Sequence, residues 1–231
     1  MSWSIDMKVL RANVAVLLLG LMTAGSATAG DNLWMGFKAG TLGLGLEATW
    51  RPIPWLDIRA GINKYDYEDT RTDAGIDYDS TLQLDSYYAT ANFLFPVSPL
   101  RVTVGAYSNG NEFQMASMAA ADFDIGNDNF LASEVGTLRS TTYFEDVAPY
   151  LGVGFDFSLV GKVGLNFDIG VLWQGDPSVS LTADGTLATD PGPLGDIFRA
   201  ELAAEQMQLE AEFEDYKAYP VISLGVTFNF F

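Results

Sequence analysis

Residues 162–173, KVGLNFDIGVLW, show the pattern that decides the fold. Every second residue from Val163 to Trp173 is large and apolar, and the residues between them are mostly glycine, asparagine or aspartate. Successive side chains of a β-strand point to opposite faces, so the stretch is predicted to be a strand with one apolar and one small, polar face. Asp168 in its middle argues against a helix that is buried all round. The pattern returns in most other segments, so the chain is predicted to be all-β, as a closed barrel or a sandwich.

The first 29 residues have the parts of a secretory signal peptide. Lys8 and Arg11 give a basic start, residues 14–21 form an apolar run, and Ala27, Thr28 and Ala29 match a cleavage site with small residues. A membrane anchor is the weaker interpretation, because the apolar run is too short to span a bilayer. We expect residues 1–29 to be a cleaved signal peptide and residues 30–231 to be the mature domain.

The composition argues against several classes of function. The 231 residues contain no cysteine and no histidine, which excludes a lipid anchor and disulfides and removes the commonest general base and metal-binding nitrogen. The formal charge is −18, and it becomes −19 without the signal peptide, which carries Asp6, Lys8 and Arg11. Nucleic-acid binding needs a basic face, so we expect none. No cofactor is expected. Outside the signal peptide no stretch resembles a transmembrane helix, so a membrane-integral form must be a β-barrel.

Eight segments are predicted to be strands: residues 33–38, 42–51, 55–65, 81–95, 100–107, 147–157, 162–173 and 221–231. The links 51–55, 95–100 and 157–162 are short, whereas residues 66–80, 108–146 and 175–217 are predicted to be long loops. Only the link at 39–41 breaks this alternation; if it is not a turn, the count falls to seven. In residues 81–95 the apolar phase changes near Asp85 and Ser86, which indicates either a bulge or a strand that leaves the apolar layer.

Two long links have features of their own. Residues 196–216 are predicted to be a helix, because apolar residues recur at helical spacings after Pro193. The helix is acidic, so its apolar stripe is expected to pack on the barrel rim or another loop, with a lid or partner-docking role as the alternative. The spacing of the acids in residues 66–80 does not match a calcium-binding loop, so a solvated acidic loop is preferred. The apolar residues of the helix are Phe198, Leu202, Leu209, Phe213 and Tyr216, and the loop acids are Asp66, Glu68, Asp69, Asp73, Asp77 and Asp79.

Three features predict that the apolar face points outward into a membrane. Each apolar face has the length of a strand that crosses a bilayer, and the opposite face is rich in glycine, as a narrow lumen requires. Aromatic residues also gather near strand ends, as interfacial girdles do. The predicted fold is therefore an eight-stranded antiparallel up-and-down transmembrane β-barrel with one helix in the last long loop. The predicted aromatic girdle consists of Trp34, Trp50, Trp55, Phe93, Phe95, Phe155, Phe157, Trp173, Phe228 and Phe230.

The predicted lumen contains charges of both signs. They are Glu47, Arg51, Asp57, Arg59, Arg101, Asp156 and Asp168. They would line a selective polar path if the lumen were open. An eight-stranded barrel is just wide enough for its own side chains, so a network of ion pairs that fills the lumen is preferred.

The signal peptide, the eight alternating strands and the terminal Phe231 resemble small Gram-negative outer-membrane β-barrels of the OmpA-transmembrane and OmpW-like kind. The resemblance is architectural, and Phe231 lies out of phase with the apolar Phe228 and Phe230. It implies a location in the bacterial outer membrane and contacts with outer-membrane lipids and lipopolysaccharide. It also implies that the barrel-assembly machinery reads Phe231 as an assembly signal, and we expect a monomer.

The expected function follows from a filled barrel. We expect an integral outer-membrane protein with a structural or surface-interaction role. The alternative is a narrow, porin-like channel for small or hydrophobic solutes, as in OmpW-like proteins. Outer-membrane barrel enzymes depend on a histidine, which this chain lacks, so no enzyme and no catalytic residue are expected.

Overall fold

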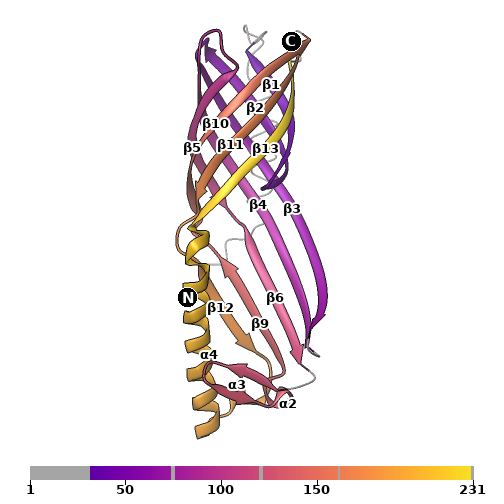
Figure 1. Cartoon of the computed structure of the whole chain (residues 1–231), viewed down its shortest axis with the longest axis vertical. Helices are drawn as coiled ribbons and strands as arrows, with labels where there is room; N and C mark the ends of the chain where they lie inside the picture. Colours follow the sequence, from indigo (N-terminus) through magenta and orange to yellow (C-terminus); the bar gives the residue numbers. More distant parts are fainter. Residues whose placement is uncertain (1–31, 74–75, 120–121, 161, 230–231) are drawn as a thin grey trace.

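The computed structural model describes residues 32–73, 76–119, 122–160 and 162–229. The predicted signal peptide, Phe230 and Phe231 lie outside these residues. Figure 1 shows an elongated molecule. A closed barrel forms one end of it, and a sheet with a long helix at its edge forms the other end. Among the described residues no helix is long and apolar enough to cross a membrane.

Eight antiparallel strands close the barrel in the order β4-β3-β2-β1-β13-β11-β10-β5, and β5 pairs back to β4. Because alternate residues of each strand are apolar and outward-facing, the strands form where the sequence predicts them. Proline at positions 96 and 99 and Pro54 lie at the short turns, where no ladder donor is needed. The strands are β1 (Leu33–Gly40), β2 (Gly43–Ile53), β3 (Leu56–Asp73), β4 (Ile76–Leu94), β5 (Leu100–Asn109), β10 (Val147–Val160), β11 (Val163–Trp173) and β13 (Ala218–Asn229).

The first link is a real turn, so the count of eight strands is confirmed. Residues of β1 and β2 pair antiparallel up to Gly40 and Gly43, with only two residues between them. Gly43 has a φ of 94°, a conformation that glycine adopts without strain. The even number of strands brings the two ends of the described chain together, since Trp34 pairs with Asn229.

The barrel wall continues beyond the barrel as a second, open part of the same sheet. β4 pairs with β5 from Ser86 onward but with β6 from Ile76 to Gln83. The sheet then continues to β9 and β12, while β3 remains on the other side of β4. We call this part, made of β12, β9, β6 and the outer halves of β4 and β3, the outer sheet. The added strands are β6 (Glu112–Ala119), β9 (Thr137–Tyr143) and β12 (Ser178–Ala183).

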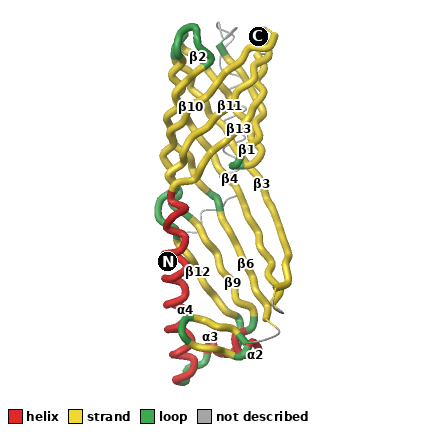
Figure 2. Tube along the Cα trace, viewed as in Figure 1, coloured by secondary structure: helices red, strands yellow, loops and turns green. Residues whose placement is uncertain are grey.

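The helices gather against the far end and one edge of the outer sheet (Figure 2). A small apolar core holds this region together, with Phe130 and Phe198 in edge-to-face contact at a centroid distance of 5.1 Å. The elements are the two-stranded sheet β7 (Phe123–Ile125) and β8 (Asp128–Phe130), the helices α2 (Ala132–Val135), α3 (Thr186–Thr189) and α4 (Pro193–Glu212), and the 3₁₀ turn η1 (Phe213–Lys217).

Three of the links predicted to be long loops contain regular structure. The loop predictions for residues 66–80 and 108–146 were wrong, whereas the helix predicted in the last link is confirmed by α4. Residues 66–80 are the paired outer halves of β3 and β4, apart from 74–75, which are not described. Residues 108–146 contain β6 to β9 and α2, and residues 175–217 contain β12 and α3 as well as the helix. Pro193 is the first residue of α4 rather than a residue before it. These links are rich in acidic residues, and for this reason the sequence pattern of their strands was interpreted as that of a loop.

The phase change at Asp85 and Ser86 has a clear cause. β3 and β4 pair without a register shift from Leu56↔Phe93 to Asp73↔Ile76, so no bulge is present there. Instead β4 leaves the barrel at this point and exchanges β5 for β6. The second of the two predicted explanations, a strand that leaves the apolar layer, is therefore correct.

Candidate functional site: the lumen and the outer sheet

The apolar faces of the barrel strands point away from the lumen. Phe37 and Leu224 are 66% and 58% exposed, while Glu47, Arg59 and Arg101 on the opposite face are buried. An apolar outer surface and a polar interior are the arrangement of a membrane barrel, the inverse of a soluble one.

Arg101 on β5 lies at the centre of an ion-pair layer that crosses the lumen. Its Nε donates to Asp156 of β10 over 2.8 Å, and a terminal nitrogen donates to Asp168 of β11 over 3.0 Å. Its side chain is fully buried. Glycine at position 154 leaves the room, because a Cβ there would overlap the guanidinium. The planar guanidinium can bind both carboxylates at once, which fixes its geometry.

Arg59 extends this layer from the other side of the barrel. It lies 3.2 Å from Asp156, 3.7 Å from Asp168 and 3.9 Å from Glu47. Glu47 in turn accepts hydrogen bonds from the Tyr88 hydroxyl at 2.9 Å and the Asn166 amide at 3.0 Å. Each carboxylate that these pairs bury therefore has a cation or a donor beside it.

A second ion pair lies near the short turns. Arg51 makes a two-pronged contact with Asp57, at 2.7 and 2.9 Å. The structure thus brings all seven sequence-predicted lumen charges into contact with one another, in two groups. Lys38 joins them as a further inward cation that the sequence analysis did not single out. Among the described residues the lumen then holds four cations and four carboxylates: Lys38, Arg51, Arg59 and Arg101, with Glu47, Asp57, Asp156 and Asp168.

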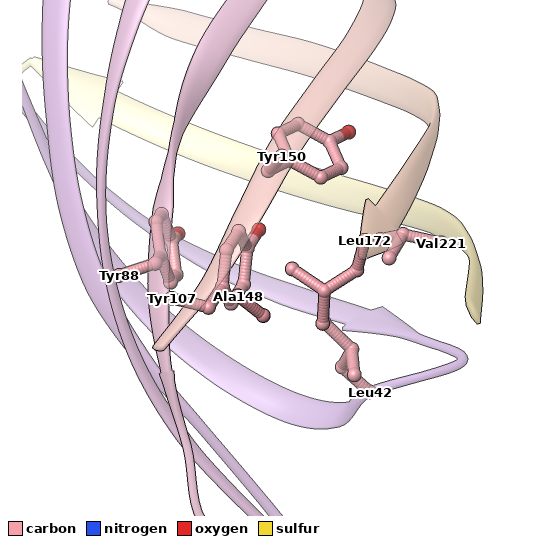
Figure 3. Close-up of a cluster of buried hydrophobic side chains, with 7 residues drawn as sticks. All are labelled: Leu42, Tyr88, Tyr107, Ala148, Tyr150, Leu172 and Val221. Carbon is pink, nitrogen blue, oxygen red and sulfur yellow. The ribbon is translucent and has the colours of Figure 1, made fainter. Parts of the chain in front are cut away.

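Figure 3 shows an aromatic layer of three buried tyrosines. The strand register places this layer beside the ion pairs, on the side toward the outer sheet. The rings of Tyr88 and Tyr107 stack with centroids 4.9 Å apart, and Tyr150 lies 5.4 Å from Tyr107. The Lys38 ammonium lies 3.8 Å from the centre of the Tyr88 ring, a cation–π contact. Leu42, Ala148, Leu172 and Val221 complete this buried cluster.

The two layers leave little free space between them. A cavity of about 20 Å³, which is room for about one water molecule, is lined by residues of both layers, among them Lys38, Glu47, Tyr107 and Asp168. In the sequence, the position of these tyrosines on the glycine-rich face of their strands was the feature that could have identified them as lumen residues. Glycine at position 170 lies where a Cβ would overlap the Tyr150 hydroxyl, so a large ring on this face is matched by a residue without a side chain.

Most of the predicted girdle residues lie on the outward face near the short turns. Trp55 stacks on Phe93 at 6.5 Å, and Trp173 lies at the opposite end of the barrel with the outward-facing Tyr87. The outward-facing members are Trp50, Phe93, Phe95, Phe155, Phe157, Trp173 and Phe228. Trp34 is a correction: its register with Thr49 and Asn229 puts it on the lumen face. Leu33, Trp34 and Met35 are all apolar, so the phase of this short strand was ambiguous.

The acids of α4 have partners in the structure. Glu201 and Glu205 accept from the backbone N–H groups of Asn127 and Gly126 in the β7–β8 turn, at 2.8 and 3.2 Å. Glu210 accepts from the N–H of Val179 on β12 at 3.0 Å. Without these carboxylates, the backbone N–H groups of the β7–β8 turn and of the β12 edge would have to hydrogen-bond to water. Among the described residues no group of three or more acids is placed to hold a metal ion.

Comparison with known proteins identifies the fold. No protein-family model and no curated protein matches the chain. The solved structure of CarO2 from Acinetobacter baumannii is 24% identical, with a TM-score of 0.56 over 85% of this chain and 97% of that one. CarO from the same organism is 23% identical, with a TM-score of 0.55 over 86% and 98%. Both are outer-membrane β-barrel proteins. The chain therefore has the fold of bacterial outer-membrane β-barrel proteins, which confirms the predicted fold class and agrees with the predicted location.

Proposed function

We propose that the protein is an integral outer-membrane protein whose barrel is a closed membrane anchor and whose outer sheet and helices present an interaction surface. The observation that supports this proposal is the packing of side chains across the barrel interior. Two layers of buried side chains, one of ion pairs and one of tyrosines, cross it, and their formal charges balance.

The balance of charge is the physical reason to prefer an anchor over a conductor. A pore that conducts ions needs an aqueous path with binding that is weak enough for the ion to leave. Here each arginine of the lumen is held by carboxylates of other strands, and opening a path would separate these ion pairs. A membrane anchor needs only the closed, mutually paired state.

We also propose the partners that such an anchor would have. The exposed apolar belt, with Phe37 and Leu224 as examples, would contact outer-membrane lipids, and the rim would meet lipopolysaccharide. The protein would act as a monomer. Phe231 is the proposed signal for the barrel-assembly machinery, and no catalytic role is proposed.

The alternative is a narrow channel for small or hydrophobic solutes, and planar-bilayer conductance separates the two. We expect silence from the wild type and from a variant without residues 192–216, which lacks the acidic helix. Steady wild-type conductance would overturn the proposal, and conductance only after the deletion would make the helix a lid. A positive control is Arg101→Ala combined with Tyr107→Ala, which removes one member of each layer and should create a conducting path. A flux assay with an uncharged solute in vesicles extends the same comparison to a route without ions.

A further inference from the structure

One edge of the outer sheet is covered and the other is open. On the β12 edge, α4 packs against the strand and Glu210 accepts from the Val179 N–H. At the opposite edge, β3 pairs with β2 only as far as Lys64, opposite Leu44. From Tyr65 to the end of the strand, β3 pairs only with β4 among the described residues. We call this nine-residue stretch, Tyr65–Asp73, the free edge of β3, because β4 is the only strand that pairs with it among the described residues; its length is that of an ordinary strand.

The inner face beside the start of this free edge, at Tyr65 and Tyr67, is apolar, and Asp69 follows them on the same face. Pairing places Tyr65 opposite Leu84 and Tyr67 opposite Leu82, and Leu82 opposite Phe113 of β6, on one face. That face continues the lumen side of the barrel. On the barrel side of Tyr65 and Leu84, the next residues of this face are Asn63 and Ser86, whose side chains hydrogen-bond to each other within the lumen.

The cover over this apolar face stops before it reaches β3. Across the sheet on β12, where α4 packs, Val179 and Leu181 are only 3% and 8% exposed. Tyr65 and Tyr67 on β3 are 45% and 49% exposed. The chain thus covers one side of the inner face with its own helix and leaves two aromatic rings open beside the free edge.

The outer face of the same edge is acidic. Asp66 and Glu68 alternate with the two tyrosines and are exposed. Thr70 donates to Asp79 across the β3–β4 pair, at 2.8 Å, on this outer face. An added strand would therefore meet aromatic rings on one face and carboxylates on the other.

We propose that the free edge of β3 is a docking site for an extended peptide segment in which basic and apolar residues alternate. Such a segment would add a strand to the outer sheet through main-chain hydrogen bonds. Its apolar side chains would lie beside Tyr65 and Tyr67, and its basic side chains would pair across the strands with Asp66 and Glu68. This inference rests on the proposed surface-interaction function and gives it a partner class.

Charge argues against a second copy of this chain as the occupant. Two β3 edges that paired would place like charges opposite one another, which destabilises a strand pair. Edge acids are one way in which sheets avoid self-association. The same acids attract a basic segment. They therefore disfavour a second copy of this chain and favour a basic partner.

The test uses the full protein in nanodiscs of zwitterionic lipid and a fluorescent peptide of about eight alternating lysine and leucine residues. Two matched peptides, one with glutamate for lysine and one with serine for leucine, serve as probes of charge and of apolar contact. We expect the lysine–leucine peptide to bind at least about tenfold more tightly than either and to weaken as salt rises. Equal binding of the lysine–serine peptide would mean attraction to the acidic surface alone and would overturn the proposal.

Variants locate the site. Tyr65→Ser with Tyr67→Ser should weaken binding by about tenfold or more, and Asp66→Asn with Glu68→Gln should weaken it and reduce its salt dependence. The control is Tyr143→Ser, which removes an equally exposed ring (48%) from the opposite face of the sheet and should leave binding unchanged. Equal effects at Tyr143 and at Tyr65 with Tyr67 would place the peptide elsewhere and contradict the proposal, as would a dimer of the wild type that excludes the peptide. None of these outcomes alters the conductance result, so the closed anchor stands or falls separately.

Discussion

At the scale of single residues, the lumen illustrates what a sequence reveals and what it leaves out. The seven charges were found because each one interrupts the pattern of a strand at an inward position. Their pairing could not be predicted, because Arg101 and Asp168 belong to β5 and β11, which are separated in the sheet by β10. The contact depends on the reach of the Arg101 side chain over Gly154 of β10, and the order of the strands alone does not define it.

Arg101→Ala should be strongly destabilising. It would remove the nearer of the two arginines that pair with Asp156 and Asp168, and breaking a buried ion pair costs about 3–5 kcal/mol. The measurement is urea unfolding of the protein refolded in lipid vesicles, followed by tryptophan fluorescence. The control is Arg139→Ala, which breaks an exposed pair with Asp184 at 2.7 Å and should cost less than about 1 kcal/mol. Equal losses of unfolding free energy in the two variants would contradict a buried ion-pair network in the lumen.

Asp184 should make the end of the outer sheet sensitive to acid. A hydrogen bond from Arg139, and then one from the Thr137 backbone N–H, hold the pKa of this carboxyl below its ordinary value. Because the folded pKa is the lower one, the contact stabilises the fold above the ordinary carboxyl pKa of about 3.9. That stabilisation is lost as the pH falls through the folded value.

The measurement for Asp184 is the hydrogen-exchange protection factor of the Thr137 amide, corrected for intrinsic rate, as the pH is lowered. Asp184→Asn cannot ionise and should show lower protection at neutral pH with no further step in acid. A step of the same size in this variant would assign the acid sensitivity to another group.

At the scale of elements, alternation predicted the barrel strands and missed the strands outside the barrel. The apolar residues of β4 face outward from Tyr87 to Phe93, where lipid surrounds the barrel. Leu82 and Leu84 face inward, where water lies outside the sheet. The surrounding solvent changes along one strand, so the apolar phase inverts without a bulge. The many acidic residues between Tyr65 and Ser80, with Glu68 and Asp69 adjacent, obscured this second apolar pattern in the sequence.

Glu210→Ala should uncover the β12 edge. Loss of the carboxylate removes the acceptor of the Val179 N–H, and a hydrogen bond to a charged group contributes about 1.5–3 kcal/mol when it is shielded from water. We therefore expect faster hydrogen exchange at the Val179 amide, with little change at the amides of the barrel strands. Glu212→Ala removes a neighbouring acid that accepts from the Gln208 side chain, and it should leave the Val179 amide unchanged. Faster exchange in both variants would indicate general loosening of α4.

At the scale of the whole molecule, charge is divided between the two parts. Residues 66–83, 110–146 and 175–217 together carry a formal charge of −19, which is the whole net charge of residues 30–231. The other parts of residues 30–231 have six acidic and six basic residues. Charge therefore accumulates where water is present and cancels where the chain crosses the apolar layer, as the cost of burying unpaired charge requires.

A minimal barrel, with these three segments replaced by short uncharged turns, should fold and be close to electrically neutral. The lumen layers consist of barrel residues alone, so its closure does not need the outer part. Heat-modifiable mobility on a gel would report folding, and isoelectric focusing would report a shift from the acidic value of about 4.1 calculated for the full sequence toward neutrality. A minimal barrel that fails to refold would show that the outer sheet supports the wall, and the full-length protein refolded in parallel is the control.

The helix that covers the β12 edge leads through η1 directly into β13, the strand that closes the barrel against β1. Lys217, at the end of η1, lies 2.7 Å from Asp176, just before β12, and so ties the two regions together. The contacts between β13 and β1 join residues at opposite ends of the chain, and contacts so distant in sequence form slowly. α4 and β13 thus complete both the cover of the β12 edge and the seam of the barrel, so a chain without them would leave β1, β11 and β12 each with an unpaired edge that another chain could join.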